Sequence, residues 1–332
     1  MQDYKVKQLQ PNHADHISYY KQDYISSMLE SEPVIAQPKY DGERILIHIN
    51  NGEVYCTSRR FSKKTDRYME NQDKLPILQE VCKDFSLGYT VIDCEAYAKD
   101  WSTAVGILHS LPERAIELQK QDVLHFAVFD CLFFNGEDIR NQPYISRLHK
   151  AYQVVQSLNY EPLHLVKIMK SSEVSYDVDD IQNASFVSKY EEIEEIMNRA
   201  IYFGFEGIVL KSLMRTYYDV GASLKCKKFE TVDCVVCGYQ QGRGKYENSV
   251  GALEIGYYDP EQDKVIQISR VNCGSDAERE MWNQNREKML NSVIEVKCQE
   301  VTDRSLRHPV YVRLREDKDY KMCTKSTIFK EC

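Results

Sequence analysis

The sequence predicts an α+β protein of two domains, in which mixed strands and helices over residues 1–230 precede a small closed β-barrel over residues 231–332. Three observations support this prediction. The length of 332 residues suffices for two cores of ordinary size. Strand-like and helix-like segments alternate in the first part. After residue 230 the chain changes to short strands and turns with one helical interruption.

The first strong local signal is a β-hairpin. The segments "RILIHIN" (44–50) and "EVYCTSRR" (53–60) carry alternating apolar residues on either side of Asn51-Gly52. Asn-Gly is the preferred sequence of two-residue hairpin turns. Lys39 stands just upstream, in "QPKYDG" (37–42). We therefore expect the hairpin to hold this lysine in place.

Further strands and two helices are predicted before residue 230. The helix over residues 190–204 is the clearest, because apolar residues recur at helical spacing and Gly204 ends the run. A second helix is expected around residues 144–157, and the polar, acidic stretch 171–183 is expected to be a loop. Segments rich in β-branched or aromatic residues predict strands at 89–98, 124–134 and 205–212.

The C-terminal part predicts about five strands and one helix. Strands are expected within residues 252–271, 291–301 and 309–317. The helix between them is opened by Ser275 with Glu278 three residues later, which is a capping-box pattern. Among small closed barrels, the OB-fold is the commonest one that handles nucleic acid, so we expect an OB-fold here.

Charge gives no general signal for nucleic-acid binding. The net charge is −8, from 43 basic and 51 acidic residues, so phosphate contacts have to come from local patches. The candidate contacts with DNA are Arg60, Lys63 and Lys64 in "RRFSKK" (59–64), Arg243 and Lys245 in "GRGKY" (242–246), and the basic run at 304–318. Taken alone, each patch is more often a solvated face than a binding site.

Cysteine usage and hydropathy indicate the compartment. The eleven cysteines are odd in number and scattered through strand-like segments, which favours free thiols in a reducing compartment. Cys234 and Cys237 form the one close pair, and without a second pair or a histidine cluster a zinc site is disfavoured. No segment is long and apolar enough for a bilayer, and no secretory signal opens the chain. We expect an intracellular, cytoplasmic protein that contacts no membrane.

Charged residues two apart share one face of a strand. Asp93 and Glu95 form such a pair inside an otherwise apolar strand, and two cationic pairs, Lys225 with Lys227 and Arg313 with Arg315, occur further on. Any one pair is explained by a solvated sheet face. Together, on strands that otherwise look buried, they suggest convergence on Lys39, because a buried charge without a partner costs several kcal/mol.

Convergence on Lys39 would suit nucleophilic chemistry on a phosphate. A lysine is almost fully protonated at pH 7, and neighbouring cations with partial burial free its amine. Arg44, Lys225 and Lys227 would supply this effect and would neutralise a polyphosphate under attack. Glu95 and Glu206 are the carboxylates expected to hold the metal ion that accompanies the phosphates.

Other phosphate and hydrolase motifs do not fit. "GRGK" (242–245) is followed by Tyr246 where a Walker loop needs Ser or Thr, and Tyr239 stands where its first glycine belongs. No dinucleotide fingerprint follows a strand, and the eight histidines are dispersed without a metalloprotease pair. A Ser-His-Asp triad cannot be assigned.

The ordered motifs resemble those of the ATP-dependent DNA ligases, a family of covalent nucleotidyltransferases. Seven motifs occur in the family's order between residues 37 and 318. Cys94 replaces the glycine of the family's Asp-Gly-Glu strand, and Ala222-Ser223 replaces the common Arg-Ser. The motifs are "KYDGER" (39–44), "SRR" (58–60), "VIDCEAY" (91–97), "FAVFDCLFFNGEDI" (126–139), "FEGIVLK" (205–211), "LKCKKF" (224–229) and "SLRHPVYVRLREDK" (305–318).

The resemblance implies a fold and a role for each residue. It implies a nucleotidyltransferase domain of ATP-grasp-like antiparallel sheets with helices, followed by the OB-fold. Lys39 would attack the α-phosphate of ATP and become a lysyl-AMP. The AMP would pass to the 5′-phosphate of a nick, and the 3′-hydroxyl would then displace the AMP.

In the family's terms the remaining residues would bind ATP or AMP and Mg²⁺ or Mn²⁺. Phe129 would stack on adenine and Gln37 would meet its polar edge. Arg44 and Arg59 would face ribose and phosphate, Glu95 ribose or metal, and Glu206 metal. Lys225 and Lys227 would hold the α-phosphate, and Arg315 and Lys318 would orient pyrophosphate.

The resemblance also implies a partner and a context. The short stretch before Lys39 leaves no room for the large N-terminal DNA-binding domain of cellular ligases, so a minimal, phage- or virus-like monomer acting on nicked duplex DNA is expected. DNA repair, replication and recombination are the processes in which such an enzyme acts. RNA ligases and GTP-dependent capping enzymes share the lysine motif, but the "REDK" ending favours DNA ligase. A non-enzymatic nucleic-acid-binding protein on a ligase scaffold is the alternative from another class.

Overall fold

The computed structural model describes residues 22–63, 66–170, 174–175, 186–227 and 229–329. The chain divides into two compact units, Met1–Lys227 and Lys228–Cys332. Within the described residues, no helix has the length and apolar character needed to cross a membrane. The ten cysteines that the structure describes are all free, as expected.

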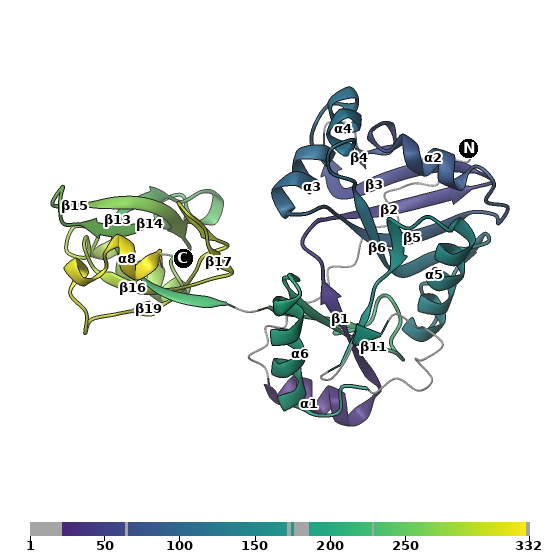
Figure 1. Ribbon diagram of the computed structural model, residues 1–332. Helices are drawn as coiled ribbons and strands as arrows, with labels where there is room; N and C mark the ends of the chain where they lie inside the picture. The colour runs from purple at the N-terminus through teal and green to yellow at the C-terminus, as the bar shows by residue number, and fades with distance from the viewer. Residues whose placement is uncertain (1–21, 64–65, 171–173, 176–185, 228, 330–332) are drawn as a thin grey trace. The chain divides into compact units, whose positions relative to one another are not determined.

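The first unit contains a seven-stranded sheet in the order β4-β3-β2-β5-β6-β7, with β8 added beside β6 (Figure 1). All its neighbours are antiparallel except β6 and β8, which are parallel. The strands are β2 (Glu43–Asn50), β3 (Glu53–Ser62), β4 (Arg67–Glu70), β5 (Thr90–Tyr97), β6 (His125–Phe134), β7 (Glu137–Asp138) and β8 (Leu163–Leu165).

The predicted hairpin is confirmed as β2 and β3. Asn51 and Gly52 have φ angles of 48° and 82°, as a two-residue turn with two left-handed residues requires. The register pairs Asn50 with Glu53 and Ile45 with Ser58. Because Lys39 lies only four residues before β2, the hairpin places the end of the preceding strand close to the large sheet.

The second sheet of this unit has five strands in the order β10-β9-β1-β11-β12. Helix α6 (Tyr190–Tyr202) packs on β11 and β1, and α1 (Gln22–Ser31) packs on α6 (Figure 1). The strands are β1 (Val34–Lys39), β9 (Ile168–Met169), β10 (Val174–Ser175), β11 (Gly207–Ser212) and β12 (Ser223–Lys227).

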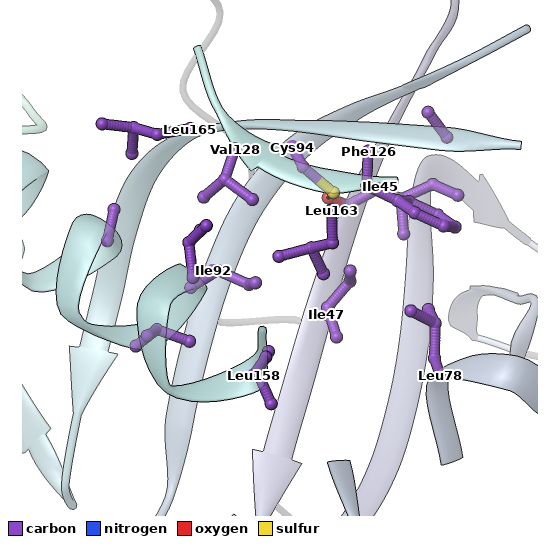
Figure 2. Close-up of a cluster of buried hydrophobic side chains, with 14 of the residues drawn as sticks. Ile45, Ile47, Leu78, Ile92, Cys94, Phe126, Val128, Leu158, Leu163 and Leu165 are labelled. Atoms are coloured by element: carbon purple, nitrogen blue, oxygen red, sulfur yellow. Dashed lines mark hydrogen bonds between the residues drawn. The ribbon is translucent and has the colours of Figure 1, made fainter. Parts of the chain in front are cut away.

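The main core lies on one face of the large sheet. Ile45, Ile47 and Ile49 alternate along β2 and are fully buried, with Leu78 of α2 (Pro76–Cys82) packed nearby (Figure 2). The Sγ–H of Cys94 on β5 donates to the backbone oxygen of Ile45 at 3.2 Å. Helix α5 (Tyr144–Leu158) adds Leu158 to the same cluster. This core fixes β2 and β5, whose alternate residues, including Arg44 and Asp93, lie on the opposite face of the sheet.

Besides the hairpin, two helices and three strands of the first unit were predicted, and four helices were missed. Helices α5 and α6 and strands β5, β6 and β11 confirm the corresponding predictions. Helices α1, α2, α3 (Trp101–Leu108) and α4 (Pro112–Gln119) were not predicted. The last three have seven or eight residues, too few for a repeating apolar pattern. Within the predicted loop 171–183, Val174–Ser175 form β10 and the other residues lie outside the described ones.

The second unit is built on a five-stranded antiparallel sheet in the open order β15-β14-β13-β16-β19. The closed barrel expected here is not found, because no pairing in the described part of the chain joins the outer strands β15 and β19. The capping box of Ser275 and Glu278 is confirmed at the start of α7. The elements are β13 (Glu230–Gln241), β14 (Val250–Asp259), β15 (Lys264–Val271), α7 (Asp276–Gln284), β16 (Val293–Cys298), β17 (Glu300–Val301), β18 (Leu306–Arg307), β19 (Val310–Leu314) and α8 (Lys325–Ile328).

Two neighbouring residues of α2 test the importance of the main core. Leu78 is fully buried, whereas Ile77 is 38% exposed. Leu78→Ala should lower the free energy of unfolding by about 2–5 kcal/mol, because it removes buried methyl groups and leaves a cavity. Ile77→Ala should lower it by roughly 1 kcal/mol or less. Urea denaturation of both variants measures the difference, and equal losses would contradict this account of the core.

Candidate active site

Lys39 is the last residue of β1, and the strand register explains its neighbours. It lies opposite Gly207 of β11, and Gly207 lies opposite Lys227 of β12. The backbone N–H of Glu206 donates to the backbone oxygen of Lys39 at 2.9 Å. Residues separated by more than 160 positions along the chain therefore meet at one corner of the small sheet.

Glu206 bridges two lysines at this corner. One carboxylate oxygen accepts from Lys39 Nζ, and the other accepts from Lys227 Nζ. The side chain of Glu206 is 6% exposed, and those of the lysines are 17% and 19% exposed. Removing the carboxylate would leave two partly buried cations facing each other, which is strongly unfavourable.

Strand alternation separates this charged corner from a second core. Gln37, Lys39, Lys211, Lys225 and Lys227 lie on one face of the small sheet because they occupy alternate positions of β1, β11 and β12. The residues between them form the opposite, apolar face beneath α1 and α6. These core residues are Ala36, Ile208, Leu210, Leu224 and Cys226.

Two glycines allow the backbone to approach closely at the site. A Cβ at Gly42 would overlap the backbone oxygen of Ala96 on β5. Gly207 has φ of +151°, and a Cβ there would overlap the backbone oxygen of Cys226. Glycine is therefore required at both positions by lack of space, and at Gly207 also by backbone conformation.

Arg44 of β2 is held rigidly by the large sheet. Its Nε donates to Asp93 Oδ1 at 2.8 Å and its Nη2 donates to Asp93 Oδ2, which makes a bidentate pair. Nη2 also donates to the Tyr217 hydroxyl at 3.1 Å. Burial alone lowers the pKa of Arg44, but Asp93 raises it above its ordinary value, so the guanidinium stays charged.

Burial and neighbouring charges shift the pKa values of two further groups, Glu95 and Lys225. Burial raises the pKa of Glu95 to about 7, although Lys39, Arg44 and Lys225 oppose that shift. Burial, together with the positive charges of Lys39 and Arg44, lowers the pKa of Lys225 to about 8. Perturbed groups gathered in one place are typical of functional sites. Here they surround Lys39 from both sheets.

Phe129 of β6 borders the same group of charged residues, next to Arg44 and Lys211. The Arg44 guanidinium carbon is 5.5 Å from its ring centroid, and Lys211 Nζ is 5.3 Å away. The Tyr144 hydroxyl donates to the backbone oxygen of Phe129 at 2.7 Å and lies 3.1 Å from Gln37 Oε1. Gln37 is 1% exposed, and its buried Nε2 has no hydrogen-bond partner within the described residues.

Glu95 and Glu206 are the two carboxylates predicted to hold a metal ion. No group of three or more potential His, Cys, Asp or Glu ligands occurs in the described residues. The side-chain carboxylate of Glu95 accepts no hydrogen bond from the described residues, whereas both carboxylate oxygens of Glu206 accept from lysines. Mg²⁺ commonly binds through one or two carboxylates plus phosphate oxygens and water. Of the two carboxylates, Glu95 is therefore the one that can bind a metal ion directly, whereas Glu206 would first have to release Lys39 or Lys227.

The remaining predicted residues belong to β3 and the segment after it, or to the second unit. Arg59 and Arg60 are on β3 and Lys63 is exposed just after it, whereas Lys64 lies outside the described residues. Arg243 and Lys245 are exposed in the second unit. Arg315 and Lys318 also belong to the second unit, where they form a cluster of their own with Asp233 and Asp317.

Sequence analysis missed several residues that organise these groups. Tyr217, Tyr144 and Asp233 contact Arg44, Gln37 and Lys318 respectively. Tyr217 lies in a loop and gave no pattern. Tyr144 occupied an apolar position of a predicted helix. Asp233 interrupts the apolar run "VDCVV", which was the one available signal.

The fold and the site together define a mixed α/β protein whose paired sheets surround a carboxylate-bridged lysine. A family model described as "ATP dependent DNA ligase domain" matches residues 17–227. The chain therefore belongs to the family of ATP-dependent DNA ligase domains.

Curated relatives agree with this family. The DNA ligase of Pyrobaculum islandicum is 29% identical over 257 residues, which cover 72% of this chain and 40% of that protein. DNA ligase 2 of Methanosarcina acetivorans is 25% identical over 315 residues, covering 85% of this chain and 51% of the relative. The chain thus spans 40% to 51% of the length of these relatives.

Solved structures share the fold. The structure named "Pmar-Lig_PreS3" has a TM-score of 0.66 at 19% identity and covers 89% of this chain and 66% of its own. The structure described as "DNA binding with a minimal scaffold: Structure-function analysis of Lig E DNA ligases" has a TM-score of 0.60 at 17% identity, covering 86% and 93%. At these identities the likeness concerns architecture.

The raised pKa of Glu95 predicts a pH effect on stability. Because folding raises this pKa from 4.5 to about 7, the folded protein binds more protons than the unfolded chain between these values. The contribution of Glu95 to stability is therefore lost as pH rises through this window. As the pH rises from 4.5 to 7, the free energy of unfolding of Glu95→Gln should increase relative to that of the unsubstituted protein. Denaturant midpoints of both proteins, measured across this pH range without nucleotide or divalent metal, test the prediction. A constant difference between the two midpoints at every pH would refute it.

Proposed function

We propose that the chain is an ATP-dependent DNA ligase that seals nicks in duplex DNA between a 3′-hydroxyl and a 5′-phosphate. The observation that carries the proposal is the Lys39–Glu206–Lys227 bridge at the corner of the small sheet. Family membership supports it, because the matched residues contain all members of this site from Gln37 to Lys227.

The proposed chemistry begins at Lys39. The lone pair of its neutral amine forms a bond to the α-phosphorus of ATP, and the bond from that phosphorus to the bridging oxygen of pyrophosphate breaks. The nitrogen then loses one proton to Glu206, whose carboxylate accepts a hydrogen bond from Lys39 Nζ. The resulting phosphoramidate holds AMP on the protein. AMP then passes to the 5′-phosphate of the nick, and the 3′-hydroxyl displaces it. Each step thus has an activated leaving group.

The residues around Lys39 have proposed roles that follow from their positions. Lys225 and Lys227 neutralise the α-phosphate as charge develops on it. Arg44 is pre-organised by Asp93 and meets ribose or phosphate, together with Arg59. Phe129 stacks on adenine, and Gln37 and Tyr144 border the same side. Mg²⁺ or Mn²⁺ at Glu95 and Glu206 would neutralise phosphate charge when bound.

Proposals for the whole chain follow from the same assignment. We propose an adenylation domain over residues 1–230 and a partly open OB-fold over residues 231–332, supported by a five-stranded antiparallel sheet with one capped helix. In the second domain Arg315 and Lys318 would orient the departing pyrophosphate. We propose an intracellular monomer that binds nicked duplex DNA.

Adenylate formation tests the first step. Incubation with ATP labelled at the α-phosphate and a divalent metal should leave label on the denatured protein, whereas labelled GTP should leave none. Lys39→Ala should abolish the label because the nucleophile is lost. Lys120→Ala, at an exposed ion pair on α4, serves as a matched control and should retain it. Label that persists in Lys39→Ala, or that comes from GTP, would overturn the proposal.

Sealing tests the substrate. A nicked DNA duplex, a nick with an RNA strand and a blunt duplex should be compared side by side, and DNA nicks should be sealed fastest. A preference for RNA ends would favour an RNA ligase. Absence of both sealing and adenylation, with Lys39→Ala unchanged in DNA binding, would favour a non-enzymatic binding protein.

Salt dependence tests the proposed DNA contacts of the second unit. Arg243→Ala combined with Lys245→Ala should weaken binding to nicked duplex and reduce the slope of log affinity against log salt by about 2, if each side chain meets one phosphate. Lys83→Ala with Lys120→Ala also removes two exposed lysines and should leave the slope unchanged. Equal slopes for both double variants would exclude these contacts.

A further inference from the structure

A second charged cluster lies wholly within the second unit. Asp233 on β13 accepts from Arg315 Nη1 at 3.2 Å on both carboxylate oxygens, and Oδ2 also accepts from Lys318 Nζ at 2.8 Å. Asp317 accepts from Arg315 Nε and Nη2 at 2.8 and 2.9 Å. The Asp233 side chain is 16% exposed, so it is the most enclosed member.

The backbone brings these side chains to Asp233. The Arg315 N–H donates to the backbone oxygen of Val293 on β16, which continues the pairing of β19 beyond its last residue. Asp233 lies on the neighbouring strand, directly opposite Glu295 of β16. Arg315 and Lys318 both follow β19, and both reach the carboxylate of Asp233 on β13, two strands away in the sheet.

The cluster retains unused donors. Arginine has five N–H donors and lysine has three. Asp233 and Asp317 accept four hydrogen bonds from Arg315, and Asp233 accepts one from Lys318. At least one donor remains on Arg315 and two remain on Lys318, and both side chains are more than one-fifth exposed. The pair can therefore bind phosphate oxygens without first releasing Asp233.

Asp233 also offsets repulsion within the pair. Arg315 lowers the pKa of Lys318, whereas the hydrogen bond from Lys318 to Asp233 raises it, and the net shift is upward. Asp317 cannot replace this effect, because within the cluster it hydrogen-bonds to Arg315 and not to Lys318, and its side chain is 66% exposed. One carboxylate thus holds two like charges close together.

We propose that Asp233 is a positioning residue that gathers Arg315 and Lys318 into one site for the terminal phosphates of a polyphosphate. This inference rests on the proposed function, in which the two cations meet the departing pyrophosphate. It adds a residue from the first strand of the second unit to that role. A carboxylate beside a polyphosphate would otherwise be unfavourable, and the two cations it holds compensate for its charge.

The test compares Asp233→Asn with Glu295→Gln in the full chain. Both replacements are near-isosteric and remove one charge from neighbouring positions of the same sheet, but Glu295 pairs with Arg313 instead. Asp233→Asn should raise the KM for ATP in lysyl-adenylate formation by roughly tenfold, as the loss of one charge-assisted contact predicts. Glu295→Gln should change it less than about twofold.

A binding measurement keeps the inference independent of catalysis. Calorimetry with inorganic tripolyphosphate, on chains that also carry Lys39→Ala, should show the same roughly tenfold loss of affinity for Asp233→Asn and none for Glu295→Gln. Asp233→Glu keeps the charge and should restore most of the affinity. Thermal melting identifies any variant that fails to fold, and Asp233→Glu then decides by itself, because it should bind within about threefold of the parent.

The outcomes separate the two proposals. Absence of lysyl-adenylate from the unsubstituted chain would refute the proposed function, whatever the tripolyphosphate result. Normal adenylation with equal KM and equal affinity in Asp233→Asn and Glu295→Gln would refute the positioning role alone. Faster adenylation in Asp233→Asn would also refute it, since Asp233 would then restrain the cations instead of presenting them.

Discussion

The bridge between Lys39, Glu206 and Lys227 is the interaction on which the rest of the site depends. It joins the ends of β1 and β12 through the residue just before β11. The bridge can therefore form only when these three strands pair in the observed register. A shift of one residue in any of these strands would send its lysine into the core beneath α6. The apolar residues of that core and the charged residues above it therefore specify the same arrangement.

Although the chain is acidic overall, several of its basic residues lie close together around Lys39. The net charge of −8 gives no hint of a cationic cluster, yet Arg44, Lys211 and Lys225 lie within one group on the two sheets of the first unit. Asp93 and Glu206 make this concentration possible by pairing with individual cations. Burial of such pairs contributes little net stability. It does hold the side chains in a defined geometry.

Periodic patterns carried most of the sequence prediction. The hairpin, α5, α6 and β5 were predictable because turn residues and apolar spacing act locally. Helices α2 and α4 were not, since each begins with a proline and has only seven or eight residues. The open sheet of the second unit was not predictable either, because barrel closure depends on the pairing of distant strands. In the site, the resemblance pointed to Lys39 and Glu206, whereas Tyr217 acts through a loop whose path no local pattern encodes.

Gly42 has a consequence for how this site can diversify. The chain leaves the small sheet at Lys39 and enters the large one at Glu43, and the backbone at Gly42 touches that of β5. Main-chain contact therefore fixes the connection between the two sheets at this point. A side chain at position 42 would displace that connection together with the end of β1. If Phe129 and Gln37 meet the base as we propose, a change of base would come from those side chains and would leave Gly42 unaltered.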